Sequence, residues 1–220
     1  MNIKVCGITQ LKQLQQLDGL NIDFAGFIFH KASPRYMDGK ITKAALQSAD
    51  FDIKKVGVFV DAEMIDILTA IEDYGLDVVQ LHGDETPLMC EDLSEEVEVI
   101  KAFAIGDGKV DIDELVADYD EVVDYYLFDT SPLPASPERG GGKAALPGGT
   151  GKKFDWKIIT NAKIEKPFFL SGGISLEDVA AIKKIKHPDF YGIDINSRFE
   201  KEPGIKDMAL ILKLKQELKW

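Results

Sequence analysis

The stretch Ile3-Lys4-Val5-Cys6-Gly7-Ile8 has the β-branched, apolar composition of a buried strand, and the segment after it, Leu11–Leu17, has the apolar spacing of a helix. This order of strand and then helix repeats along the chain. Strands joined by helical crossovers run parallel, because only a short hairpin turn places the next strand antiparallel beside the first. The opening of the sequence therefore predicts an α/β protein with a parallel sheet.

Eight stretches share the strand pattern, and eight helical stretches alternate with them. The predicted strands are Ile3–Ile8, Phe24–Phe29, Lys55–Val60, Val78–His82, Val97–Ala104, Tyr125–Asp129, Pro167–Ser171 and Tyr191–Ile195. The predicted helices are Leu11–Leu17, Thr42–Ala49, Ala62–Tyr74, Pro87–Leu93, Ile112–Val123, Asp155–Thr160, Leu176–Ile185 and Ile205–Leu218. Eight such units predict a (β/α)₈ TIM barrel, with eight parallel strands and outer helices in a single domain over residues 1–220.

Capping patterns support two of the predicted helix boundaries. Asp61 stands just before the third helix, and Ser175 with Asp178 has the spacing of a capping box before the seventh. Residues 131–153, after the sixth strand, are rich in proline and glycine and predict a long loop, which is either functional or mobile. This loop contains Gly151-Lys152 but has Leu146 where a P-loop needs its first glycine, so we do not predict nucleotide binding there.

The composition limits the classes of protein that fit this chain. Of its 220 residues, 45% are hydrophobic and 29% are charged, which is typical of a globular domain with a full core. The net charge of −12 argues against nucleic-acid and membrane partners, because an acidic surface repels phosphate groups. No apolar run reaches the roughly 18 residues of a membrane span, and the first residues lack a signal-peptide pattern, so we expect a cytoplasmic protein.

Polar residues follow most of the predicted strands at their carboxyl ends. The segments are Cys6-Gly7-Ile8-Thr9, Ser33-Pro34-Arg35-Tyr36, Gln80-Leu81-His82-Gly83, Asp129-Thr130, Ser171-Gly172-Gly173 and Asp194-Ile195-Asn196-Ser197. In a barrel these ends meet at one rim, which is where barrel enzymes carry their chemistry. We therefore expect the side chains to surround a common site.

Some of these residues are suited to binding an anion. Gly172 and Gly173, followed by a capped helix, are typical of a phosphate site, although a plain glycine turn has the same composition. Arg35 has the forked donor geometry that matches a carboxylate or phosphate, and a solvated surface arginine is the alternative. His82 contacts a ligand or is structural; its position at a strand end leaves both open.

The sequence gives no sign of a metal site or of disulfides. No group of His, Cys, Asp and Glu residues has metal-ligand spacing. Two cysteines are too few for a disulfide framework. Cys90, in a polar helical stretch, is expected to be a small buried hydrophobic residue, whereas Cys6 ends a strand at the predicted rim.

Several motifs together resemble those of the phosphoribosylanthranilate isomerase family. They are Lys4-Val5-Cys6-Gly7-Ile8-Thr9, Ser33-Pro34-Arg35-Tyr36, Val79-Gln80-Leu81-His82-Gly83, Leu127-Phe128-Asp129-Thr130, Gly149-Thr150-Gly151-Lys152 with Phe154-Asp155-Trp156, and Leu170-Ser171-Gly172-Gly173-Ile174. They follow the family's order over nearly the whole chain. Two segments depart from the family pattern. Arg198 stands where the family usually has glycine, beside the expected phosphate site, and the loop after the sixth strand is longer than in the family, with the extra stretch Gly140-Gly141-Gly142.

The resemblance implies an isomerase of tryptophan biosynthesis. Its substrate is N-(5-phosphoribosyl)anthranilate, which an Amadori rearrangement converts to an aminoketose with Cys6 as general base and Asp129 as general acid. The implied substrate-binding residues are Arg35 at the anthranilate carboxylate, Gly172, Gly173, Asn196 and Ser197 at the phosphate, and in addition His82 and Asp194. No cofactor is implied, because the iminium intermediate is itself the electron sink. The implied partner is this small phosphorylated molecule, bound by a monomer or a homodimer.

These roles place demands on two pKa values. A free thiol has a pKa near 8.5, so the site has to lower the pKa of Cys6 or work with a small thiolate fraction. Asp129 has to carry a proton in order to donate it, so burial or a nearby negative charge should raise its pKa.

Two other functions fit a barrel of this kind. Lys101 on the fifth strand could face the barrel interior and form a Schiff base, as in an aldolase or an indole-glycerol-phosphate synthase-like lyase. It could equally pair with Asp129 or another carboxylate. A barrel that binds a sugar phosphate without turnover is the third possibility, and the presence of both Cys6 and Asp129 argues against it.

Overall fold

Eight parallel strands form a closed barrel in which each strand pairs with the next and β8 pairs with β1. The computed structural model describes residues 1–105, 110–129, 156, 159 and 161–219. The strands are β1 (Asn2–Cys6), β2 (Phe24–Ile28), β3 (Lys54–Phe59), β4 (Val78–Leu81), β5 (Glu98–Ala104), β6 (Tyr125–Asp129), β7 (Phe168–Ser171) and β8 (Phe190–Ile195). The predicted (β/α)₈ barrel is confirmed, and every predicted strand is present within two residues of its predicted bounds.

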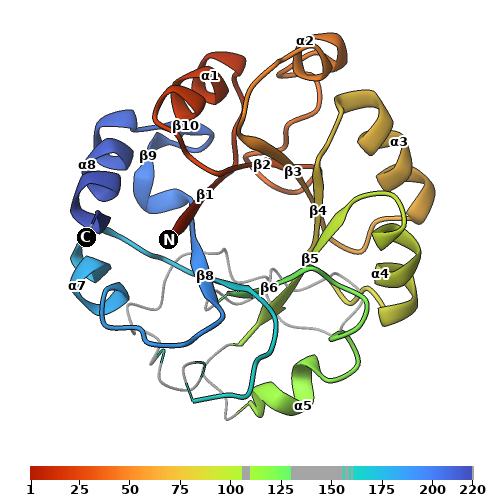
Figure 1. Ribbon diagram of the computed structural model, residues 1–220. Coiled ribbons are helices and arrows are strands. Elements are labelled where there is room, and N and C mark those ends of the chain that lie inside the picture. The colour runs from red at the N-terminus through yellow and green to blue at the C-terminus, as the bar shows by residue number, and fades with distance from the viewer. Residues whose placement is uncertain (106–109, 130–155, 157–158, 160, 220) are drawn as a thin grey trace, which may run out of the picture.

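Helices form a ring outside the strands (Figure 1). They are α1 (Leu11–Gly19), α2 (Lys43–Gln47), α3 (Met64–Tyr74), α4 (Pro87–Ser94), α5 (Ile112–Val116), α7 (Val179–Ile182) and α8 (Met208–Leu218). A 3-10 turn, Leu176–Asp178, precedes α7, and a second one, Ser197–Phe199, follows β8. The predicted loop 131–153 and most of the predicted helix Asp155–Thr160 lie outside the described residues.

The helices α2, α3, α5, α7 and α8 are all shorter than the sequence predicts, and the differences at α5 and α8 have clear causes. The α5 helix ends at Val116 instead of Val123, where the following acidic residues would oppose the negative end of the helix dipole. The last helix begins at Met208 instead of Ile205, because a small hairpin of β9 (Glu200–Glu202) and β10 (Ile205–Lys206) precedes it. The side chain of Asp207 then caps α8 by accepting hydrogen bonds from its first turn.

The capping prediction at the third helix was wrong, and the one at the seventh is confirmed. The residue before α3 is Glu63, not Asp61, and Asp61 itself has a left-handed φ of 49°. Its carboxylate instead accepts a hydrogen bond from the backbone of Asp84 at 2.7 Å, so it ties the loop after β3 to the loop after β4. Ser175 and Asp178 form the predicted capping box.

Side chains alternate between the barrel interior and the layer beneath the helices, as strand geometry requires. The interior contains a compact cluster, and the outer layer contains the larger part of the core. A bulge in β8 changes this alternation: Phe168 pairs with Phe190 and Phe169 with Gly192, which leaves Tyr191 as an extra residue. Tyr191 therefore packs against the interior cluster, and Asp194 also reaches the interior, where it meets Lys4.

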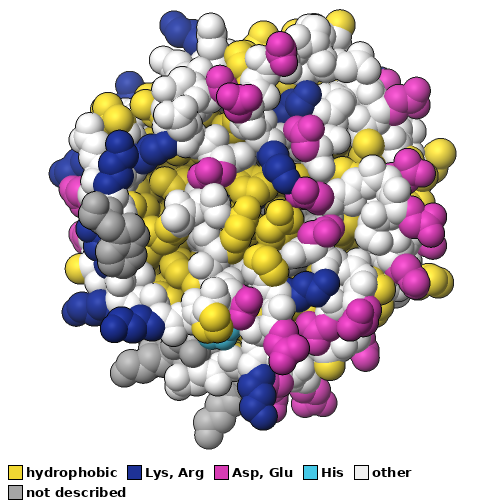
Figure 2. All heavy atoms as spheres, viewed as in Figure 1, with side chains coloured by type: hydrophobic (Ala, Val, Ile, Leu, Met, Phe, Trp, Pro, Cys, Tyr) yellow, Lys and Arg dark blue, Asp and Glu magenta, His cyan; other side chains and the backbone are white. Residues whose placement is uncertain are grey.

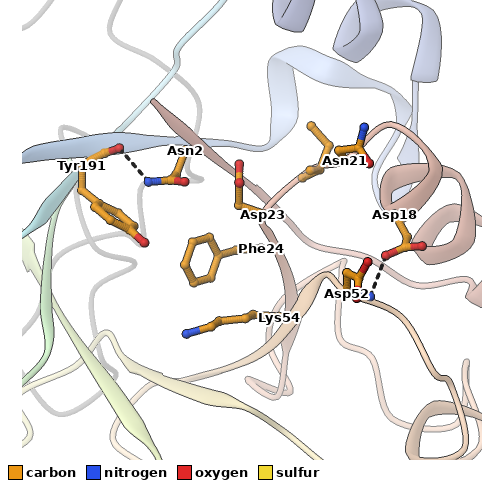
Figure 3. Close-up of a pocket in the computed structure, with 9 residues that line it drawn as sticks. Asn2, Asp18, Asn21, Asp23, Phe24, Asp52, Lys54 and Tyr191 are labelled. Atoms are coloured by element: carbon orange, nitrogen blue, oxygen red, sulfur yellow. Dashed lines mark hydrogen bonds between the residues drawn. The ribbon is translucent and has the colours of Figure 1, made fainter.

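Aromatic rings close the end of the barrel at which the strands begin. Phe24, Tyr125, Phe169 and Tyr191 contact one another there, mostly edge to face. Hydrophobic side chains gather over the middle of the face shown in Figure 2, with charged side chains around them. A pocket of about 280 Å³, with Lys54 among its lining residues, opens beside this cluster (Figure 3). It lies at the strand starts, so it is separate from the predicted rim site.

No helix in the described part of the chain is long and apolar enough to cross a membrane.

Candidate active site

The predicted site residues at the strand ends do meet at one rim of the barrel. Cys6 ends β1 and Asp129 ends β6, with His82 directly after β4 and Asp194 near the end of β8. The Cys6 side chain is buried in the interior cluster, and Gly26 on the neighbouring strand leaves room for it. A Cβ atom at Gly26 would lie 3.0 Å from the Cys6 sulfur, closer than normal packing allows. The thiol is therefore closely packed beneath the carboxyl rim of the barrel.

A buried ion pair lies beside the thiol. Lys4 Nζ is 2.9 Å from Asp194 Oδ1, and the lysine side chain is fully buried. Burial lowers the pKa of Lys4, but Asp194 and Cys6 together outweigh burial and leave that pKa above its ordinary value. Lys4 is therefore a permanent positive charge in the barrel interior. Ser171, at the end of β7, donates to the other oxygen of Asp194 at 3.3 Å.

The surroundings of Cys6 act on its pKa in both directions. Burial raises the pKa of the thiol, while the positive charges of Lys4, Lys206 and Arg35 lower it and Asp194 raises it. The net direction is upward, so the resting group is a thiol. The structure therefore does not lower the pKa of Cys6, and a base role for this thiol has to work with a small thiolate fraction.

His82 lies between Asp129 and a buried glutamine. Its Nε2 is 3.7 Å from Asp129 Oδ2, and its Nδ1 is 3.3 Å from the side-chain nitrogen of Gln80. Burial and the charge of Lys4 lower the pKa of His82 to about 4, so the imidazole is neutral at physiological pH. A direct contact between His82 and substrate stays a prediction.

Arg35 is held by a carboxylate of the protein itself. Its Nε and Nη2 donate to Glu200 at 2.6–3.0 Å, and Glu200 also accepts from Lys206 at 2.7 Å. Burial would raise the pKa of Glu200, but the hydrogen bonds from Arg35 and Lys206 outweigh it and lower the pKa. Glu200 takes the N–H of Nε and one N–H of Nη2, which leaves Nη1 and the second N–H of Nη2 to bind a ligand. The two-point carboxylate contact expected of Arg35 is therefore compatible with its bond to Glu200.

Gly7 brings Arg35 close to the end of β8. Its φ of 80° is in the left-handed region, and a Cβ atom there would lie 2.6 Å from Arg35 Cδ and 2.9 Å from Asn196 Oδ1. Asn196 Oδ1 also accepts from Lys206 at 2.8 Å. The Asn196 side chain therefore belongs to the Arg35 network, and any contact that it makes with phosphate remains a prediction.

The predicted phosphate end has the expected backbone form. Gly172 and Gly173 have φ values of 101° and 64°, which other residues rarely adopt. The side chain of Ser197 is exposed, and so is that of Arg198. Arg198 does not have the left-handed φ that would require the family's glycine, so this departure causes no backbone strain.

Of the two alternatives for Lys101, the structure excludes the interior position and supports a buried pair with a carboxylate. Ile100 and Ala102 belong to the interior cluster, so Lys101 between them points toward the outer layer. There its Nζ contacts Glu85 at 2.8 Å and the Gly83 carbonyl oxygen at 2.8 Å. A lysine on the outer face of the barrel does not reach a substrate in the barrel mouth, so Lys101 is not placed to form a Schiff base. Its carboxylate partner is Glu85, not Asp129.

Four residues of this rim were not identified from the sequence. Lys4 and Gln80 each lie two positions before a predicted site residue on a strand, so they share its face of the sheet. That spacing is a signal that could have found them. Glu200 and Lys206 are adjacent only because the β9–β10 hairpin folds back, which no local pattern reveals. Among the described residues no group of three His, Cys, Asp or Glu side chains could hold a metal ion.

A thiol and a carboxylate face the interior of a (β/α)₈ barrel at its carboxyl rim, with anion-binding groups around them, and such a site is that of a barrel enzyme. A family model described as N-(5'-phosphoribosyl)anthranilate (PRA) isomerase matches residues 3–217. The N-(5'-phosphoribosyl)anthranilate isomerase of Parabacteroides distasonis is 40% identical over 99% of this chain and 93% of that protein. The chain belongs to the N-(5'-phosphoribosyl)anthranilate isomerase family.

Solved structures agree with this assignment. Monomers generated from the dimeric phosphoribosylanthranilate isomerase of Thermotoga maritima superpose with a TM-score of 0.76 at 27% identity, over 99% of this chain and 98% of that one. A phosphoribosylanthranilate isomerase in complex with reduced 1-(o-carboxyphenylamino)-1-deoxyribulose 5-phosphate superposes with a TM-score of 0.75 at 27% identity, with the same coverage. The family resemblance of the sequence motifs is thereby confirmed.

Proposed function

We propose that Cys6 and Asp129 are the general base and general acid of this chain's isomerase reaction. The chain is a phosphoribosylanthranilate isomerase of tryptophan biosynthesis, as its match to the family over nearly its full length shows. The observation that supports the two roles is the placement of both side chains on interior-facing positions of the same rim. They come from β1 and β6, so a substrate in the mouth of the barrel lies between them.

The reaction needs two proton transfers on opposite sides of the sugar. Asp129 gives a proton to the furanose ring oxygen, and the ring opens to an iminium ion. Cys6, as the thiolate, then removes the proton from C2′, and the resulting enolamine tautomerises to the ketone. General acid–base groups of this kind each contribute about 10²- to 10⁴-fold to a rate.

The binding groups divide between the two ends of the substrate. We assign the anthranilate carboxylate to Arg35, through Nη1 and the second N–H of Nη2, while Glu200 holds Nε and the first N–H of Nη2. We assign the phosphate to the backbone at Gly172 and Gly173, with Ser197 on the neighbouring strand end. Asp194 supports this site indirectly, because its contacts are with Lys4 and Ser171. A relative was crystallised with reduced 1-(o-carboxyphenylamino)-1-deoxyribulose 5-phosphate, a ligand that carries both a carboxylate and a phosphate and so needs a partner for each.

The test is a pair of conservative substitutions. Cys6→Ser should lower kcat by at least about 10²-fold, because an alcohol is a far weaker base than a thiolate. Asp129→Asn should lower kcat by a similar factor with little change in KM, because the amide keeps the shape but has no acidic proton to give. Steady-state kinetics by the fluorescence change of phosphoribosylanthranilate measures both.

Cys90→Ser is the matched control. Cys90 is also fully buried, but it lies on α4 outside the barrel interior. Its substitution should leave kcat unchanged. A Cys6→Ser enzyme with near-normal kcat would exclude the thiol as the base, and an Asp129→Asn effect confined to KM would make Asp129 a binding residue.

We also propose that the chain forms a homodimer in the cytoplasm. The Thermotoga relative is described as dimeric, which favours a homodimer over a monomer. Light scattering of the purified protein distinguishes the two states.

A further inference from the structure

Gln80 has an unusual position for a polar side chain. It lies on β4 with 1% of its surface exposed, and it faces the barrel interior two residues before His82. Its amide nitrogen is 3.3 Å from Nδ1 of His82, while its side-chain oxygen has no hydrogen-bond partner in the described part of the chain. Burying an unpaired oxygen costs stability, and an apolar side chain would avoid that cost. Packing alone therefore does not explain a glutamine here.

The charges around His82 keep its ring neutral. The positive charges of Lys4 on β1 and Lys101 on β5 lower the pKa of His82. The carboxylates of Asp194 on β8 and Glu85 after β4 raise it, and the Asp129 carboxyl group on β6 also faces the ring. Burial and Lys4 prevail, and the pKa of His82 falls to about 4. A neutral imidazole carries one proton, so one ring nitrogen donates and the other accepts.

The partner of each nitrogen decides where that proton lies. The amide nitrogen of Gln80 can only donate, so Nδ1 has to accept. The proton then lies on Nε2, which faces Asp129 Oδ2 at 3.7 Å. That separation is too long for a hydrogen bond, but it closes with a small movement of either side chain.

We propose that Gln80 is a positioning residue that holds His82 as the neutral Nε2–H tautomer, and that this N–H orients Asp129 and stabilises the carboxylate formed when Asp129 gives up its proton. The proposal rests on the general-acid role of Asp129. A histidine of the opposite tautomer would present a lone pair to Asp129 and would repel the carboxylate.

Nitrogen-15 NMR of the wild-type protein tests the tautomer directly. The chain has three histidines, His30, His82 and His187, so each ring can be resolved by substitution. His187 is an internal reference: its Nδ1 accepts from the backbone of Asp189, and its Nε2 faces the Ala162 carbonyl oxygen. We expect His82 to give the same pattern at pH 7, with the proton on Nε2. A proton on Nδ1 of His82 would overturn the proposal.

Two substitutions test whether Gln80 sets this state. Gln80→Met has a similar volume and no donor, so the Nδ1 signal should move to that of a free lone pair and kcat should fall by roughly 10-fold with KM nearly unchanged. Gln80→Glu replaces the donor by an acceptor, so Nδ1 should acquire a proton. Unchanged His82 signals, or an unchanged kcat for Gln80→Met, would refute the role of Gln80.

Gln13→Met is the matched control. Gln13 on α1 is also buried with an unpaired side-chain oxygen, and its amide donates to the Gly204 carbonyl oxygen, which keeps a second donor in Thr9. This variant should leave the His82 signals unchanged. A fully active Asp129→Asn enzyme would refute the proposed general acid. The tautomer measurement does not depend on Asp129, so it tests the role of Gln80 toward His82 separately.

Discussion

At the scale of single residues, Cys6 shows why a chemical role can be predicted from sequence while its energetics cannot. Its place at a strand end within a recognisable motif predicts the candidate base. The pKa depends on burial and on Lys4, Lys206 and Arg35, and Lys206 and Arg35 come from distant segments. Because burial prevails, the thiolate is rare but strongly basic once formed.

His82 provides a prediction at this scale. Its pKa of about 4 lies below the ordinary 6.5, so the unfolded chain binds a proton there between these pH values and the folded protein does not. The stability due to His82 is fully present above pH 6.5 and is lost as the pH falls toward 4. The expected loss is on the order of 3 kcal/mol. Urea unfolding at a series of pH values measures it.

His82→Gln is the control, because glutamine stays neutral over the whole range. The variant should lose less stability than the wild type between pH 6.5 and 4, and the difference between the two curves isolates His82 from the carboxylates. Parallel curves would show that His82 is protonated in the folded protein as readily as in the unfolded one.

At the scale of elements, the strands were predictable and the β9–β10 hairpin was not. Each strand is a short apolar run between turn residues, and this pattern is local. In the hairpin, Ile205 fits the apolar stripe of the following helix, so a longer helix was predicted. Pro203-Gly204 is a turn signal just before that predicted helix, and Gly204 has the left-handed φ of 84°, so the turn had a local signal while the strand pairing across it did not. The hairpin matters because it places the Glu200 carboxylate within hydrogen-bond distance of Arg35.

The Arg35 network leads to a prediction about substrate affinity. Glu200 leaves Nη1 and the second N–H of Nη2 open, so the anthranilate carboxylate can bind Arg35 at two points. A charge-assisted contact of this kind is worth about 1.5–3 kcal/mol, so KM of Arg35→Ala should rise roughly 10- to 150-fold with a smaller change in kcat. Steady-state kinetics and product binding measure the effect.

Lys40→Ala is the control for charge. Lys40 is exposed on the same loop and contacts the Pro34 carbonyl oxygen, so its loss removes a positive charge without disturbing Glu200. It should change KM less than twofold. If Arg35→Ala left KM at the wild-type value, the anthranilate end of the substrate would lie elsewhere.

At the scale of the whole molecule, the count of eight units was enough to predict a closed barrel. The contacts that join the last strand, β8, to the first, β1, were not predictable. The first and last strands pair through four residues of each, from Asn2 with Gly192 to Val5 with Ile195. Their interior faces are joined by the ion pair of Lys4 and Asp194. The bulge at Tyr191 brings Asp194 into the interior, and an irregularity of this kind leaves no mark in hydrophobic periodicity.

The last prediction concerns the ion pair between β1 and β8. Lys4→Met should lower the free energy of unfolding by about 3–5 kcal/mol, because it leaves Asp194 buried without its partner. Burial raises the pKa of Asp194, so part of that loss should be recovered at low pH, where the lone carboxyl group takes up a proton. Urea unfolding at pH 7 and at pH 4 measures both effects.

The double variant Lys4→Met/Asp194→Leu should recover most of the lost stability, because well-packed apolar residues replace a buried ion pair at little cost. Lys54→Met is the matched control at the other end of the barrel, where Lys54 and Glu98 form a pair with 39% and 38% of their side chains exposed. Its loss should cost less than about 1 kcal/mol, since water screens it. If the double variant were no more stable than Lys4→Met alone, the unpaired charge of Asp194 would not be the source of the loss. The lysine would then stabilise the barrel through its packing between β1 and β8.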